Sequence, residues 1–174
     1  MTIYEPSPAA DALVAAWWAA VHRAGEFPQT VGPSLAPLSA FLAHFQPPTV
    51  LLYEADADGL WFAAWLEPAM SGAFLGLWVA PHRRRSRAAL TAFESVLTMA
   101  LGRCPVVFGI TRQAKLLDAH TRLGYTILGE FPGLFFGETA WLLSLTRADF
   151  ERATTTRRRR SQAVAVKVAV GVIS

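Results

Sequence analysis

Residues 79–90 read VAPHRRRSRAAL, and this stretch decides how the surrounding chain is arranged. An apolar segment ends at Pro81, four arginines follow, and an alanine-rich helical pattern then begins. Apolar residues recur every three or four positions from there, which predicts an amphipathic helix from about residue 84 to residue 101. These apolar positions are Leu90, Phe93, Leu97 and Leu101. Because the first N–H groups of a helix are unpaired and its dipole is positive there, this turn favours an anion.

The segments on either side predict an α/β fold. Three strands in quick succession, joined by turn-rich linkers, indicate an antiparallel meander before the arginines. A strand–helix–strand unit and two further strands follow, which together imply a mixed sheet with helices on both faces. The expected strands are residues 2–4, 49–55, 59–69, 72–81, 105–110, 125–130 and 135–146, and the other expected helices are residues 8–25, 35–45 and 111–124.

This order of elements, together with RRRSRA at residues 83–88 and HTRLGY at residues 120–125, resembles the GNAT acyltransferase superfamily over residues 1–146. Members carry an Arg/Gln-x-x-Gly-x-Gly/Ala signature directly after the fourth strand. The resemblance implies a mixed, mostly antiparallel sheet of about seven strands, with helices on both faces, and acetyl-CoA as co-substrate. It assigns the pantetheine arm to the main chain of Trp78, Val79 and Ala80, and the pyrophosphate to Arg83, Arg84, Arg85, Ser86, Arg87 and Ala88.

The signature departs from the family pattern at Ser86, which stands where members have glycine. Glycine permits close approach of a ligand and unusual backbone angles. Serine is small and adds a hydroxyl group, so the departure weakens the expectation of a coenzyme site without removing it.

Two residues are candidates for acid–base catalysis. His120 occupies the place of the tyrosine that commonly protonates the departing thiolate in this family, and histidine can be a general acid near neutral pH. Glu67, at the end of the third expected strand, is the acid best placed to deprotonate an amine. Each has an ordinary alternative, His120 as a helix-surface residue and Glu67 as a solvated charge.

The sequence gives no support for a metal site, a disulfide or a membrane segment. His22, His44 and His82 have no metal-ligand spacing with Cys104 or with nearby acids, so we expect no metal. One cysteine excludes an internal disulfide. Neither a secretion signal nor an apolar run of membrane length is evident, so we expect a cytoplasmic protein, with a virion as the alternative.

Residues 147–174 form a basic extension beyond the GNAT-like domain of residues 1–146. The domain holds nine Lys/Arg and eleven Asp/Glu, a charge of −2, whereas the extension holds seven and two, a charge of +5. Valines alternate from residue 164 to residue 172, which predicts that residues 161–174 form a strand that docks on a sheet edge or a protein partner. The uninterrupted cations Arg157, Arg158, Arg159 and Arg160 suit contact with nucleic-acid phosphates.

The sequence leaves three functions open, the last of them a soluble nucleic-acid binder that depends on Arg157–Arg160, and with them the question of whether the chain is an enzyme. The first is an N-acetyltransferase in which an amine of a small molecule or protein attacks acetyl-CoA directly. The second is a catalytically inactive, GNAT-shaped subunit of a nucleic-acid-containing assembly such as a bacteriophage virion, docked through its extension. The motifs favour the first, and the departures at Ser86 and His120 favour the second.

Overall fold

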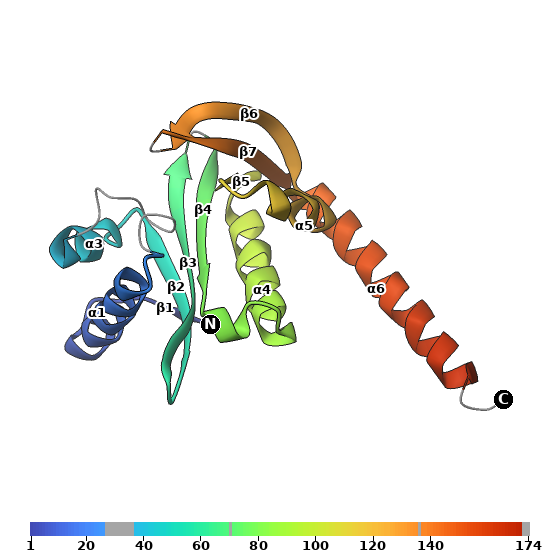
Figure 1. Cartoon of the computed structure of the whole chain (residues 1–174), viewed down its shortest axis with the longest axis horizontal. Coiled ribbons are helices and arrows are strands. Elements are labelled where there is room, and N and C mark those ends of the chain that lie inside the picture. The colour runs from blue at the N-terminus through green and yellow to red at the C-terminus, as the bar shows by residue number, and fades with distance from the viewer. Residues whose placement is uncertain (27–36, 70, 136, 172–174) are drawn as a thin grey trace. The chain divides into compact units, whose positions relative to one another are not determined.

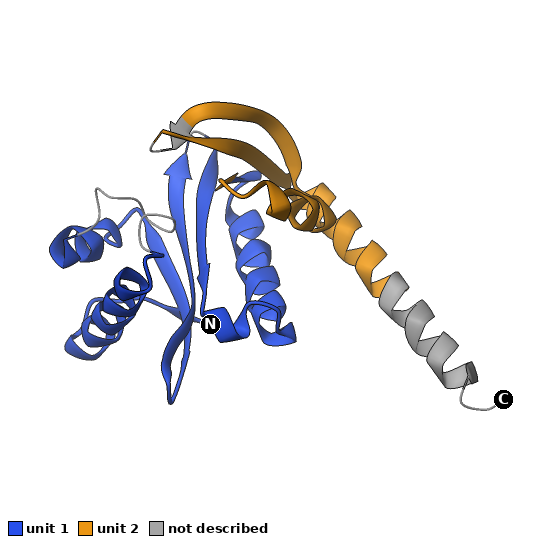
Figure 2. Ribbon diagram, viewed as in Figure 1, with its two compact units in different colours: residues 1–109 blue, residues 110–174 orange. Residues whose placement is uncertain are grey.

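The computed structural model describes residues 1–26, 37–69, 71–135 and 137–171. The chain divides into two compact units, residues 1–109 and residues 110–174 (Figure 2). The described residues contain seven strands, most of them antiparallel to a neighbour, together with helices. The predicted mixed α/β class is therefore confirmed.

The centre of the first unit is the predicted antiparallel meander. β1 (Thr2–Ile3), β2 (Val50–Asp56), β3 (Gly59–Ala69) and β4 (Gly72–Val79) each pair antiparallel with the next. β5 (Val106–Thr111) lies parallel to β4, and it begins in the first unit and ends in the second. A parallel neighbour needs a crossover connection, which the helix after the arginines provides.

Helices cover both faces of this meander (Figure 1). α1 (Pro8–Arg23) and α3 (Leu38–His44) lie on one face, and α4 (Arg87–Arg103) lies on the other. Side chains alternate along a strand, so β3 contributes side chains to the core on both faces of the sheet. Trp65 packs towards α1 and α3, and Phe62 points to the opposite face. The buried aromatic residues of the core between these helices and the sheet are Tyr4, Trp17, Phe41, Phe45, Trp65 and Trp78.

Gly76 allows this aromatic core to form. It lies directly opposite Trp65 in the β3–β4 register. A Cβ at residue 76 would lie 1.9 Å from Cε2 of the Trp65 ring, so the indole packs over the position that a side chain would take. Glycine is therefore required here for space.

The second unit contains a hairpin and two helices. A short 3-10 turn, Ala114–Leu116, leads into α5 (Leu117–Arg122). β6 (Thr126–Phe135) and β7 (Glu138–Thr146) form the antiparallel hairpin. α6 (Arg147–Gly171) begins directly after β7.

The extension differs from its prediction. Residues 161–171 are helical and belong to α6, so the predicted strand at 161–174 is wrong in its described part. Alanine alternates with the valines, and alanine is the strongest helix former. Extending an existing helix fixes one residue at a time without a new nucleus, whereas a strand needs a partner edge. Residues 35–36, 136 and 172–174 of the predicted elements lie outside the described residues.

Candidate functional site

The pairing between β4 and β5 stops early. Its register contains Ala73 with Val107 and Phe74 with Phe108, and it goes no further among the described residues of the first unit. β4 nevertheless continues to Val79. The last part of β4 therefore has β3 on one side and no strand partner within this unit on the other.

The main-chain groups of Leu77 and Val79 face this unpaired side. The N–H of Ala80 donates to the carbonyl of Trp61 at 2.8 Å, which makes residues 61 and 80 a hydrogen-bonded pair. In an antiparallel ladder such pairs alternate, so Trp78 also directs its main chain to β3. Of the three residues predicted to contact pantetheine, Val79 is the one that faces away from β3.

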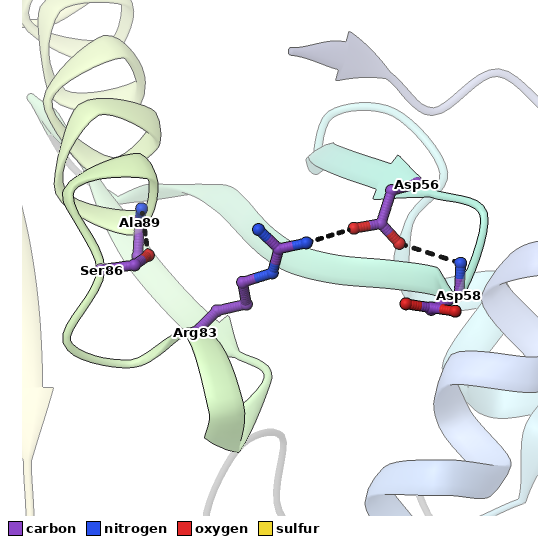
Figure 3. A network of polar contacts seen from close by, with 5 residues as sticks. All are labelled: Asp56, Asp58, Arg83, Ser86 and Ala89. Atoms are coloured by element: carbon purple, nitrogen blue, oxygen red, sulfur yellow. Dashed lines mark hydrogen bonds and ion pairs between the residues drawn. The ribbon is translucent and has the colours of Figure 1, made fainter.

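The edge of β4 leads through a turn into the N-terminus of α4. Ser86 is the N-cap of α4, and its Oγ accepts the N–H of Ala89 at 3.1 Å (Figure 3). Its φ of −81° and ψ of 153° are ordinary extended values. The backbone here does not require glycine, because positive φ is absent. The serine that departs from the family signature caps the helix.

The main-chain donors of the turn divide into two groups. The N–H of Arg83 donates to Ala80 at 2.8 Å, and the N–H of Ser86 donates to Arg83 at 2.9 Å. Arg84 donates at 3.4 Å to Pro81. Where the turn enters α4, the N–H groups of Arg85, Arg87 and Ala88 form no hydrogen bond to another described residue, and at the start of the turn the same holds for His82.

Arg83 is held by a carboxylate from the β2–β3 turn. Its Nη2 lies 2.6 Å from Oδ2 of Asp56, and Figure 3 shows the two side chains facing each other. Asp56 also accepts the N–H of Asp58 at 3.0 Å, which fixes the carboxylate in the turn. The guanidinium stands over the Trp61 ring at 5.5 Å, a cation–π contact.

Arg84 is held from two directions. Its Nε donates to the carbonyl of Val79 at 3.0 Å, and its Nη2 forms an ion pair with Oε1 of Glu26. The other oxygen of Glu26 accepts the indole N–H of Trp78 at 2.9 Å. Glu26 thus ties the arginine turn to the aromatic core.

Arg85 and Arg87 are exposed and have no ion pair in the part of the chain that the structure describes. Their charges and the three unpaired N–H groups belong to the same turn at the positive end of α4. Sequence reasoning treated the four arginines alike. The structure separates Arg83 and Arg84, which are neutralised locally, from Arg85 and Arg87, which are not.

Glu67 has a partner that the sequence did not indicate. Oε1 of Glu67 lies 3.1 Å from Nε2 of His44, which projects from the last turn of α3. Glu67 lies two residues beyond Trp65, so it shares the face that α1 and α3 cover. The pair is half-buried, and it joins α3 to the end of β3.

His120 lies on α5 in the second unit. Its Nδ1 is 2.7 Å from the Leu116 carbonyl, so Nδ1 carries the hydrogen. Its ring packs edge-on against Tyr125, with the two centroids 5.6 Å apart. Burial lowers the pKa of His120, and the hydrogen bond to Leu116 opposes this only in part. The imidazole is therefore neutral at pH 7, with Nε2 left as an acceptor.

Other site classes find no support in the described residues. No group of three or more His, Cys, Asp and Glu there is arranged to hold a metal ion. No helix in the described part of the chain is long and apolar enough to cross a membrane. Cys104 donates its Sγ–H within the chain to the Ala100 carbonyl at 3.1 Å, and burial raises the pKa of the thiol.

Comparison with solved structures decides the fold. No protein family and no curated protein matches the chain by sequence. Ribosomal-protein-alanine N-acetyltransferase from Brucella melitensis matches with a TM-score of 0.66 at 16% identity, covering 84% of this chain and 99% of that one. The chain has the GNAT fold.

Two further GNAT-fold neighbours were crystallised with coenzyme A. The spermidine N-acetyltransferase from Vibrio cholerae in complex with CoA and spermine matches with a TM-score of 0.65 at 11% identity, covering 86% of this chain and 96% of that one. An aminoglycoside 6'-N-acetyltransferase complexed with coenzyme A matches with a TM-score of 0.61 at 16% identity, covering 84% and 97%. The family resemblance inferred from residues 83–88 and 120–125 is thus confirmed at the level of the fold.

Proposed function

We propose that the chain is an N-acetyltransferase that binds acetyl-CoA along the edge of β4 and at the N-terminus of α4. The observation that carries the proposal is the early end of β4–β5 pairing, which leaves the main chain of Leu77 and Val79 without a strand partner within the first unit. This edge runs directly into the turn with the unpaired N–H groups. Pantetheine contains amide groups that suit a strand edge, and a diphosphate suits a helix N-terminus.

Within this proposal, Arg85 and Arg87 bind the pyrophosphate, together with the N–H groups of Arg85, Arg87 and Ala88. Arg83 and Arg84 shape the turn, since Asp56 and Glu26 already neutralise them. Charge-assisted bonds from guanidinium to phosphate are stronger than neutral ones. Coenzyme affinity should therefore depend more on Arg85 and Arg87 than on the other two arginines.

In the proposed reaction the acetyl group passes directly from acetyl-CoA to the amine. The amine nitrogen attacks the thioester carbonyl, the C–N bond forms, the C–S bond breaks, and the thiolate takes a proton. We assign Glu67, with His44, to receiving the proton of the amine, and His120 to protonating the thiolate; because the imidazole starts neutral, its Nε2 first takes a proton from solvent, and the imidazolium then donates that proton to the thiolate while the amine's proton leaves Glu67 for solvent. A lowered pKa makes the imidazolium of His120 a stronger acid once it forms. No covalent enzyme intermediate is needed, so Cys104 takes no part.

Titration calorimetry with acetyl-CoA tests the coenzyme site. The wild type should bind, and Arg85→Gln/Arg87→Gln should weaken binding by roughly 100-fold, because each charge-assisted bond contributes about 1.5 kcal/mol. Arg103→Gln is the matched control, an exposed arginine at the other end of α4 that should leave affinity unchanged. Absence of binding by the folded wild type, or equal binding by the double variant, would refute the proposal.

Turnover is tested by the release of CoA thiol with a panel of amines. The acceptors that the names of the neighbouring structures indicate, spermine, an aminoglycoside and a ribosomal-protein alanine, are reasonable first choices. Nothing in the described residues supports the alternative of a virion subunit, and we do not propose it. The domain boundary at residue 146 and the nucleic-acid contact of the arginine run remain predictions.

A further inference from the structure

The arginine run of the extension is not uniform. Arg157 folds back onto the second unit: its Nη1 donates to the carbonyl of Arg122 at 2.9 Å, and its Nη2 donates to Oγ1 of Thr154 at 3.0 Å. Arg158 and Arg159 are exposed on the same helix. One arginine of the run therefore serves an internal contact that joins residues 35 positions apart.

The carbonyl that Arg157 binds belongs to the last residue of α5. The final carbonyls of a helix have no partner within the helix, and the negative end of the dipole favours a cation. α5 has only six residues, so its own hydrogen bonds hold it weakly. The guanidinium from α6 supplies both a hydrogen bond and a charge where α5 ends.

A second contact fixes α6 against the turn that follows α5. Gly124 has a φ of +102°, and a Cβ there would lie 2.8 Å from the main-chain oxygen of Asp149 and 3.2 Å from Cβ of Ala153. The first turns of α6 therefore pack directly on this turn. Phe150 and Tyr125 are both buried. The start of α6 is an integral part of the second unit.

His120 lies on α5, and the groups near its imidazole ring come from α5 itself, from Tyr125 and from α6. Asp118 and Arg122 on the same helix pair with each other at 2.6 Å. Tyr125, which precedes β6, contacts the imidazole ring, and Arg157 comes from α6. Burial dominates the shift in the His120 pKa, so a looser α5 would let water reach the ring.

We propose that Arg157 is a positioning residue, which fixes the C-terminal end of α5 and through it the orientation of His120. The effect on turnover rests on the proposed function, whereas the effect on the imidazole does not. The remaining exposed arginines, Arg158 and Arg159, take no part in this contact.

The test compares Arg157→Gln with Arg158→Gln and Arg159→Gln, which make the same change of charge on the same helix. NMR titration of the His120 imidazole in the full chain without ligand is the first measurement. We expect Arg157→Gln to raise the His120 pKa towards its ordinary value or above, because a cation is lost and α5 becomes better solvated, and we expect no shift in the two controls. Arg157→Lys, which keeps the charge, should restore part of the wild-type value and remains available if the glutamine variant does not fold.

Steady-state kinetics are the second measurement. Arg157→Gln should lower kcat roughly tenfold and leave KM for acetyl-CoA unchanged, since misplacing a proton-transfer group affects the reacting geometry. An unchanged His120 pKa in Arg157→Gln, or an equal shift in either control, would overturn the positioning role. A shift in Arg157→Gln alone without loss of kcat supports the contact and refutes the catalytic assignment of His120.

Discussion

Replacing Ser86 separates its capping role from any role in binding the coenzyme. The Oγ of Ser86 accepts the N–H of Ala89 at 3.1 Å, and the backbone is extended with negative φ. Alanine keeps this backbone and removes the acceptor, whereas glycine also removes the side chain but lets water reach the helix end. We therefore expect Ser86→Ala to destabilise the chain more than Ser86→Gly.

The expected loss of stability follows from the energy of the N-cap hydrogen bond. Serine to alanine at an N-cap costs about 1 kcal/mol, and serine to glycine costs a few tenths. For a chain of 174 residues, about 1 kcal/mol lowers Tm by roughly 2–4 °C. Because Ser86→Gly frees the N–H of Ala89 beside the unpaired donors, acetyl-CoA affinity should be equal to the wild type or tighter.

Urea denaturation and titration calorimetry measure the two effects on the same samples. Ser95→Ala is the matched control: Ser95 lies inside α4, and its Oγ donates to the Thr91 carbonyl at 2.9 Å, so alanine there should be neutral or stabilising. Equal stability of the alanine and glycine variants at residue 86 would show that the cap contributes nothing. Loss of coenzyme affinity in Ser86→Gly alone would show that the hydroxyl group contacts the ligand.

Three further changes test the surrounding structure. Gly76→Ala should lower the free energy of unfolding by about 3 kcal/mol, measured in urea, because the new Cβ overlaps the buried Trp65 ring. Gly129→Ala is the control: its Cβ meets the exposed Phe131 ring at 3.0 Å, so it should change the free energy of unfolding little. Equal effects of the two substitutions would contradict the packing of Trp65 on Gly76. The hydroxyl of Tyr4 donates to Asp11 at 2.5 Å, and the pKa of Tyr4 is raised to about 12. The protonated hydroxyl should therefore contribute fully to the free energy of unfolding below pH 10, and this contribution should be lost between pH 10 and 12. Tyr4→Phe should remove this alkaline loss of stability. The pKa of His120 is lowered, so folding should lose stability as pH falls below 6.5, and His120→Gln should flatten that acid limb in denaturation measured from pH 7 to pH 5.

The strands before the arginines and the helix after them could be predicted because the spacing of apolar residues and the turn-forming linkers indicate the same elements. Apolar spacing located α4, although the helix begins at Arg87 rather than at residue 84 because Ser86 occupies the N-cap, a role that was not assigned to it from the sequence. The meander follows from three apolar runs and short linkers. The extension was mispredicted because alternating valine and alanine satisfy both a strand period and a helix propensity.

The pairing of the charged residues could not be predicted. Arg83 meets Asp56 across 27 positions, and Arg84 meets Glu26 across 58. Such contacts depend on how the turns come together in space, and no local pattern encodes them. The same holds for His44, which was considered only as a metal ligand and is instead the partner of Glu67. Sequence located the arginine turn, and only the structure distinguished its four cations.

In the proposed coenzyme site, the part of β4 that lacks a strand partner within the first unit also bears on inhibitor design. A strand edge accepts any extended backbone whose amides have the matching spacing, whatever its side chains. A short peptide-like molecule that ends in a diphosphate mimic would use the main chain of Leu77 and the N–H of Val79 for the ladder, since Arg84 already holds the Val79 carbonyl, and the start of α4 for the anion. Such a compound needs no thioester, so occupancy of this edge can be measured independently of catalysis.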